Sequence, residues 1–119
     1  MGPTTLQEYE LFEGSSGKLT FTITDEDGVV IPAASIVSAV LTLKDKQTGT
    51  IINSRTAQNI LNANGVTISS AGVLVWEISY LDTAMVGTDR SEEHLAVFKI
   101  VTADVHARME VSMSIIHID

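Results

Sequence analysis

Residues 73–80 (VLVWEISY) alternate large apolar side chains with smaller or polar ones. Successive side chains of a β-strand point to opposite faces, so this period of two predicts a strand with one buried face. The buried face would consist of Leu74, Trp76, Ile78 and Tyr80. Trp76 alternates in phase with its apolar neighbours, and we therefore expect it in a core rather than on a sugar-binding surface.

The same alternation recurs along most of the chain, with apolar residues two positions apart. It covers residues 19–23, 37–43, 94–100 and 109–115. Counting shorter segments as well, seven to eight strands are predicted, at spacings of about 8–15 residues. Short strands with at most one short helix are typical of an all-β fold, and we predict an immunoglobulin-like antiparallel β-sandwich.

The connections between these strands show turn chemistry. Asp27-Gly28 tolerates positive φ and predicts a type I′ hairpin turn, and Asn64-Gly65 is a second strong turn signal. Residues 44–49 (KDKQTG) predict a polar hairpin loop, and residues 50–53 (TIIN) a short returning strand. Residues 82–86 (DTAMV) predict one helical turn, with Asp82 as its N-cap.

The chain has 119 residues, of which 45% are hydrophobic, and no cysteine. This length suits one domain with a sizeable core. Antibody-type sandwiches carry a Cys…Trp…Cys pattern, so this domain would be held by packing alone, which suits assembly in a reducing cytosol. We place the sandwich at residues 17–119, after an extended N-terminal arm at residues 1–16.

The charge is strongly acidic, with 7 Lys and Arg against 15 Asp and Glu and a net charge of −8. The basic residues are scattered singly, so the chain lacks the basic surface that phosphate backbones and anionic membranes attract. We therefore expect neither nucleic acid nor a membrane as a partner. The sequence also lacks a long apolar run and a basic, apolar leader, so no membrane span and no signal peptide are expected.

The sequence contains no pattern of a nucleophilic enzyme. Cysteine and the G-x-S-x-G motif are absent, and the serines fall in predicted turns or on strand faces. Residues 25–28 begin like a calcium loop, but Val30 and Ile36 occupy the positions where an EF-hand has Gly and Glu. Glu92 and Glu93 are neighbours on a predicted strand, so they face opposite ways and cannot act as an acid/base pair. We expect no catalytic residue and no cofactor.

The three histidines are dispersed along the chain. His94 begins one predicted strand and His117 ends its neighbour, so the two could meet across the last hairpin. Carboxylates for a zinc site would come from Glu92, Glu93 and Asp119, which are close in sequence. A hydrogen-bonded surface or interface histidine explains these positions better, so we predict no metal.

The N-terminal arm has three large apolar residues within four positions, Tyr9, Leu11 and Phe12, interleaved with glutamates. Leaving such side chains in water forgoes about 1.5–3 kcal/mol each. A frayed acidic arm is one interpretation, and an arm that adds an edge strand to this domain or to a neighbour is the other. The aperiodic segment 54–63 is a second candidate for partner contact. The predicted partner-binding residues are Tyr9, Leu11, Phe12, Arg55, Asn59 and Asn62.

Four segments together resemble a known family. They are residues 19–31 with the DEDG turn, residues 51–67 with NSR and LNANGV, residues 72–83 with GVLVW and DT, and residues 93–98 (EHLAVF). Across residues 17–118 the chain is similar to the small immunoglobulin-like virion proteins of tailed bacteriophages. That family commonly has Gly in the final hairpin turn, where this chain has residues 103–106 (ADVH), a departure that concerns the turn type rather than the fold.

The resemblance implies a non-enzymatic structural protein of the virion. Its first expected role is that of a capsid decoration or cement protein, a homo-oligomer or a symmetric multi-copy assembly bound to the major capsid protein or other virion proteins. Such a protein would assemble in the cytoplasm of the host bacterium. Two alternatives stay open: a head–tail connector or tail/baseplate component, and a carbohydrate-binding or adhesin module.

Overall fold

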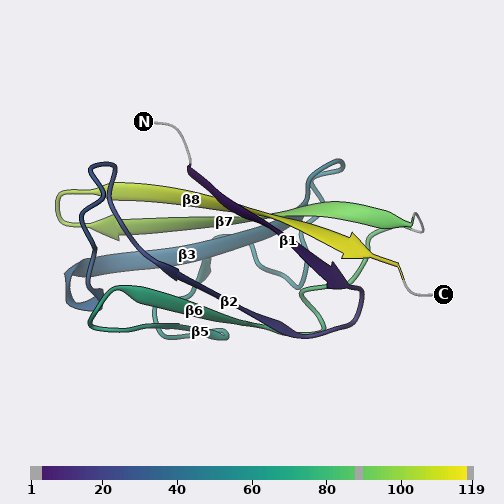
Figure 1. The fold of residues 1–119 in the computed structure, drawn as a ribbon, viewed down its shortest axis with the longest axis horizontal. Helices are drawn as coiled ribbons and strands as arrows, with labels where there is room; N and C mark the ends of the chain where they lie inside the picture. Colours follow the sequence, from purple (N-terminus) through teal and green to yellow (C-terminus); the bar gives the residue numbers. More distant parts are fainter. Residues whose placement is uncertain (1–3, 88–89, 118–119) are drawn as a thin grey trace.

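Eight β-strands form two sheets that pack face to face (Figure 1). The computed structural model describes residues 4–87 and 90–117. Within these ranges the helical content is one 3₁₀ turn, Ala33–Ser35, and no helix has the length and apolar character that a membrane crossing requires. The strands are β1 Thr4–Phe12, β2 Gly17–Thr22, β3 Ile36–Asp45, β4 Gln58–Asn59, β5 Val66–Ile68, β6 Val73–Ile78, β7 Ser91–Thr102 and β8 His106–Ile116.

The larger sheet has the strand order β1-β8-β7-β3-β4, and the smaller sheet has the order β2-β6-β5. All neighbours pair antiparallel except β1, which runs parallel to β8. The chain crosses between the sheets after β1, β2, β4 and β6, and the last hairpin lies within the larger sheet. This is the connectivity of an immunoglobulin-like sandwich, so the predicted fold class is confirmed.

The inner faces of the two sheets meet in one apolar core. Trp76 on β6 is fully buried, and its ring meets Phe98 of β7 edge-on, with 5.8 Å between centroids and 75° between planes. Phe21 of β2 makes a second edge contact with Phe98, at 5.3 Å and 73°. Such pairs contribute about 0.5–1.5 kcal/mol beyond the burial of their surface. The prediction that Trp76 lies in the core is confirmed.

Two apolar residues predicted to face the core are exposed instead. Tyr80 is 63% exposed, because β6 ends at Ile78 and the chain then turns. Val37 is 68% exposed, because the β3–β7 register shifts between Ile36 and Ser38 and Ile36 takes the buried position. A β-bulge changes which residues of a strand face inward, and the alternation of residue types alone does not reveal it.

The two predicted turns differ in the structure. Asn64 and Gly65 have φ of 55° and 87°, as in a type I′ turn, so the turn predicted there is confirmed. In the other turn only Gly28 has a positive φ, of 80°, and the type I′ prediction there is wrong. The Asp25 carboxylate accepts the N–H groups two and four residues later, at 2.9 and 3.0 Å, and so holds a different turn.

Two further local predictions are wrong. Residues 82–86 form an irregular turn without a helix, because long-range contacts engage the Asp82 carboxylate. Residues 50–53 form no strand: Ile51 makes one isolated bridge to Lys44, and Asn53 and Ser54 then take φ of 54° and 55°.

The N-terminal segment lies on this domain's own larger sheet (Figure 1). β1 begins opposite Met109 of β8 and ends with Phe12 opposite Ile116. A turn that includes Gly14, with φ of 70°, then leads into β2 of the other sheet. β1 therefore covers the edge of β8, whose backbone groups would otherwise be open to pairing with another chain.

Candidate functional site

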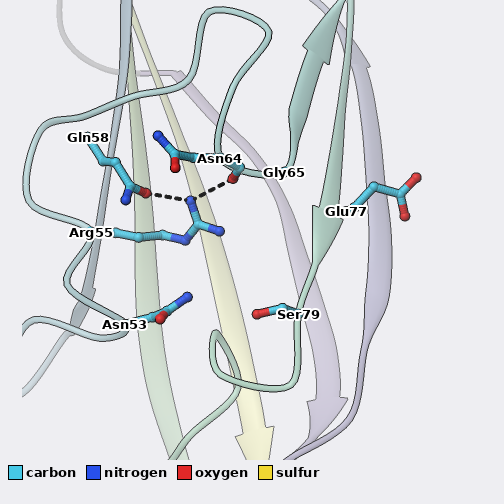
Figure 2. A pocket seen from close by; sticks show the side chains of 7 residues that line it. All are labelled: Asn53, Arg55, Gln58, Asn64, Gly65, Glu77 and Ser79. Atoms are coloured by element: carbon cyan, nitrogen blue, oxygen red, sulfur yellow. Dashed lines mark hydrogen bonds between the residues drawn. The ribbon is translucent and has the colours of Figure 1, made fainter.

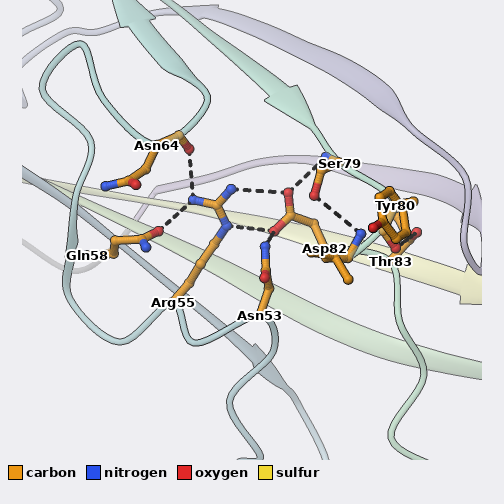
Figure 3. Close-up of polar contacts among 9 residues, drawn as sticks. Asn53, Arg55, Gln58, Asn64, Ser79, Tyr80, Asp82 and Thr83 are labelled. Carbon is orange, nitrogen blue, oxygen red and sulfur yellow. Dashed lines mark hydrogen bonds and ion pairs between the residues drawn. The ribbon is translucent and has the colours of Figure 1, made fainter.

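A buried ion pair joins two loops of the sandwich (Figure 3). Arg55 lies in the loop between β3 and β4, and Asp82 lies in the loop after β6, 27 positions later. Arg55 Nε is 2.6 Å from Asp82 Oδ1, and Nη2 is 3.2 Å from Oδ2. The guanidinium therefore binds the carboxylate through two parallel hydrogen bonds, the strongest form of this pair.

The Asp82 carboxylate is fully buried and accepts two further hydrogen bonds. Asn53 Nδ2 donates to Oδ1 at 2.8 Å, and the Ser79 N–H donates to Oδ2 at 2.9 Å. Burial by itself would raise the pKa of Asp82, but the hydrogen bonds from Arg55, Asn53 and the Ser79 N–H outweigh it and hold that pKa below its ordinary value. The carboxylate is therefore ionised in the folded protein at neutral pH.

The Arg55 side chain connects this ion pair to the core. Its Cζ lies over the Trp76 ring, 5.6 Å from the centroid, a cation–π contact. Nη1 donates to Gln58 Oε1 at 2.8 Å and to the Asn64 carbonyl at 3.1 Å. Most N–H groups of the guanidinium are therefore hydrogen-bonded within the domain. These bonds hold the loop 53–65 in place.

A polar hollow of about 340 Å³ opens beside Arg55 (Figure 2). In the figure Gln58 and Asn53 lie close to the guanidinium, whereas the Glu77 carboxylate points away from it. Ser79 Oγ accepts the Leu81 N–H at 3.3 Å. The hollow therefore offers hydrogen-bonding groups to a polar ligand or to the backbone of a partner. Its lining consists of Asn53, Arg55, Gln58, Asn64, Gly65, Glu77 and Ser79.

The histidines do not meet in the way that the sequence suggested. The β7–β8 register places Met113 opposite His94. His117 lies beyond the end of β8, and its Nδ1 is 2.7 Å from Glu13 Oε1. Asp119, which the sequence offers as a third carboxylate for a zinc site, lies outside the described residues.

His94 instead belongs to a buried cluster with two carboxylates. Its Nε2 is 2.9 Å from Glu92 Oε1, and Asp45 lies opposite it on β3. Burial by itself would raise the pKa of Glu92, but the N–H groups of Val86 and Gly87 and the His94 side chain outweigh it and hold that pKa below its ordinary value. The cluster closes the end of the core between β3 and β7.

The predicted partner-binding residues of the arm lie on β1. Leu11 is partly buried and packs against the core, whereas Phe12 is 55% exposed. Tyr9 lies opposite Met113 in the β1–β8 register. Of Leu11 and Phe12, Phe12 presents the apolar surface that a partner could cover.

The other three predicted residues make contacts within their own segment or with the core. Arg55 is only 5% exposed. Asn59 Oδ1 accepts the Leu61 N–H at 3.2 Å, and Asn62 Oδ1 accepts the Ile68 N–H at 2.8 Å. Arg55, Asn59 and Asn62 therefore lie in one segment around β4, and their hydrogen bonds hold its shape.

Two acidic residues of these sites were missed by sequence reasoning. The sequence pattern predicts a helix cap at Asp82 and a polar hairpin loop around Asp45. Each side chain finds its partner across a long stretch of chain, Arg55 for Asp82 and His94 for Asp45. Only the pairing of strands could have revealed the contact of Asp45, because the register of β3 with β7 places Asp45 beside His94.

Exposed apolar side chains gather at one end of the sandwich. The Thr83 hydroxyl donates to the Ser15 carbonyl at 2.8 Å, which ties the loop after β6 to the turn that follows β1. We name the surface around this contact the end patch. It consists of Phe12, Tyr80, Leu81 and Val86, which are 55%, 63%, 48% and 42% exposed.

The comparisons with known proteins do not assign this domain to a class, so its class follows from its strand topology. No protein-family model and no curated protein matches the chain. It is similar to a sialyltransferase from Photobacterium damsela, with 13% identity and a TM-score of 0.45 over 96% of this chain, and it spans only 18% of that protein. It is also similar to a chimeric titin Z1Z2 functionalised with a KLER peptide from decorin, with 15% identity and a TM-score of 0.44, over 97% of this chain and 91% of that one. By strand order and pairing, the chain is an immunoglobulin-like β-sandwich.

Proposed function

We propose that this chain is a non-enzymatic structural protein of a tailed-bacteriophage virion, and that it decorates the outer surface of the capsid. The sequence resemblance over residues 17–118 supports this role. The structural observation that carries the proposal is the end patch, where four large apolar side chains remain exposed at one end of a narrow domain. Large apolar side chains that stay exposed near one another favour a protein contact site.

The end patch is suited to a small contact that is repeated many times. Full burial of a large apolar side chain contributes about 1.5–3 kcal/mol, and these four are already partly buried, so one patch supports only modest affinity. A symmetric capsid offers many equivalent sites, and linked copies bind far more tightly than single ones. The net charge of −8 favours a neutral or basic capsid surface and keeps the domain away from the packaged genome.

The proposal is tested by decorating purified capsids that lack this protein. Leu81→Ser removes apolar surface from the end patch, and we expect it to weaken binding by about 10-fold or more. Val37→Ser is the matched control, because Val37 is 68% exposed at the start of β3, away from the end patch. A Leu81→Ser protein that binds capsids as tightly as wild type contradicts the proposal.

Copy number separates this role from that of a connector or tail component. A decoration protein is present in hundreds of copies per particle, whereas ring-shaped connectors hold about six or twelve. Quantitative mass spectrometry of purified particles measures this number directly. The fully buried Trp76 cannot serve as the exposed aromatic platform that a carbohydrate-binding module needs.

A further inference from the structure

Three metal-ligand side chains converge where β3 ends and β7 begins. Asp45 is the last residue of β3 and lies directly opposite His94 in the β3–β7 register. Glu92 precedes His94 by two positions on β7, so both side chains lie on the same face of the sheet. One possible ligand atom from each residue lies within 4.8 Å of the other two.

The cluster is buried and has an excess of negative charge. His94 is fully buried, Asp45 is 4% exposed and the Glu92 side chain is 9% exposed. In residues 4–87 and 90–117, no lysine or arginine forms an ion pair with either carboxylate. Even a protonated imidazole would leave one negative charge uncompensated. Buried charges are costly unless they are paired or bind a metal ion.

Hydrogen bonds from neighbouring loops orient both carboxylates. Asp45 Oδ2 accepts the Thr48 N–H at 2.9 Å and the Thr48 hydroxyl at 2.6 Å. Glu92 Oε1 accepts the Val86 N–H at 2.8 Å, and the Gly87 N–H donates to Oε2. Outer contacts of this kind hold ligands in place at metal sites.

The His94 ring has hydrogen-bonding capacity that the surrounding protein does not use. Nε2 lies beside Glu92, whereas Nδ1 is buried and has no hydrogen-bond partner among the described residues. A buried polar atom without a partner costs about 1–3 kcal/mol. Nε2 is therefore the ring nitrogen that faces the carboxylates and can serve as the metal ligand.

We propose that Asp45, Glu92 and His94 bind one divalent transition-metal ion, and that Zn²⁺ fits them best. The imidazole favours Zn²⁺ over Ca²⁺ and Mg²⁺, which prefer oxygen ligands alone. A doubly charged ion neutralises both carboxylates. Zinc sites with three protein ligands leave a fourth position for water. This site and the capsid role are independent of each other.

The distances in the cluster are close to those of a zinc site. Zn²⁺ holds nitrogen and oxygen ligands at about 2.1 Å, so the ligand atoms of a tetrahedral site lie about 3.4 Å apart. His94 Nε2 and Glu92 Oε1, now 2.9 Å apart, need to separate by about 0.5 Å. The widest pair, within 4.8 Å, needs to close by about 1.4 Å at most.

Calorimetric titration of the full chain, without a polyhistidine tag and freed of metal by a chelator, tests the site with Zn²⁺ alone. We expect one Zn²⁺ per chain and affinity at least about 10-fold weaker in Asp45→Asn. Glu93→Gln is the matched control: it removes one negative charge from the same strand, but Glu93 is exposed on the opposite face. This variant should bind Zn²⁺ as wild type does.

A second readout needs no substitution and so does not depend on the folding of a variant. Zn²⁺ should shift the ring nitrogen resonances of His94 in the wild-type protein and leave those of His106 and His117 unchanged. Three results would each overturn the inference: no stoichiometric Zn²⁺ binding, equal affinity of wild type and Asp45→Asn, or ring shifts at His117 instead of His94. Tighter binding of Ca²⁺ than of Zn²⁺ would overturn it too, because the imidazole would then not be a ligand.

Discussion

The guanidinium of Arg55 binds the buried carboxylate of Asp82 through two hydrogen bonds, although 27 residues separate them in the sequence. The pair joins the loop between β3 and β4 of the larger sheet to the loop that leaves β6 of the smaller sheet. In a sandwich without cysteine, this ion pair is a polar connection between loops of the two sheets.

Asp82→Asn should destabilise the protein strongly. The variant leaves the Arg55 charge buried without its partner, and breaking such a pair costs about 3–5 kcal/mol. The free energy of unfolding in urea measures this loss. Glu77→Gln is the control, because it breaks the exposed Lys18–Glu77 pair at 3.4 Å, and exposed pairs contribute about 1 kcal/mol or less.

Removing both charges should cost less than removing one. The double variant Arg55→Met, Asp82→Leu leaves no buried charge without a partner, and apolar replacement of buried pairs is often neutral or stabilising. We expect its free energy of unfolding to exceed that of Asp82→Asn. A double variant less stable than Asp82→Asn would show that the Arg55 contacts to Gln58 and Asn64 outweigh the ion pair.

The stability of the domain should fall in acid because of Asp82. Its pKa is lower in the folded protein than its ordinary value of 3.8, so the unfolded chain takes up the proton first as pH falls. The stabilisation is therefore complete above that value and is lost as pH falls through the lower, folded pKa. Unfolding measured between neutral pH and about pH 2 should show a shallower acid dependence in Asp82→Asn than in wild type. Equal slopes would contradict the role of Asp82.

Gly72→Ala should be more damaging than Gly49→Ala. Both glycines have positive φ, 76° and 77°, which costs an alanine about 1–2 kcal/mol. A Cβ on Gly72 would also lie 2.6 Å from Val30 Cγ1 and 2.7 Å from the Ile31 carbonyl oxygen, whereas one on Gly49 would have no neighbour within 4 Å. We expect the clash to add about 1–3 kcal/mol at Gly72, measured by urea unfolding. Equal losses in the two variants would contradict it.

Deletion of residues 1–13 should expose the edge of β8 while the two-sheet core remains. The β8 backbone groups that now pair with β1 would then exchange their amide hydrogens faster, which hydrogen exchange detects. An uncovered edge also favours association, so the truncated protein should dimerise or aggregate at lower concentration than wild type. Unchanged exchange along β8 would contradict the parallel β1–β8 pairing.

Most of the fold could be predicted because strand formation depends on local patterning. The alternation in residues 109–115 predicted the inner face of β8, and Met109, Val111, Met113 and Ile115 are all buried. The Asn64-Gly65 turn was predictable for the same reason, since positive φ at two successive residues is a local requirement. The errors at Val37 and Tyr80 have another origin, because a bulge and a strand end depend on the neighbouring strand.

The sequence by itself determined the all-β class, the buried position of Trp76 and the strands that enclose it, because side-chain alternation is read over a few residues. Only the tertiary structure decided what the polar residues do. Arg55 meets Asp82, and Asp45 meets His94 and Glu92, through loop positions and strand register that join distant parts of the chain. No local pattern encodes such a meeting, because it depends on how the strands pair and how the two sheets pack.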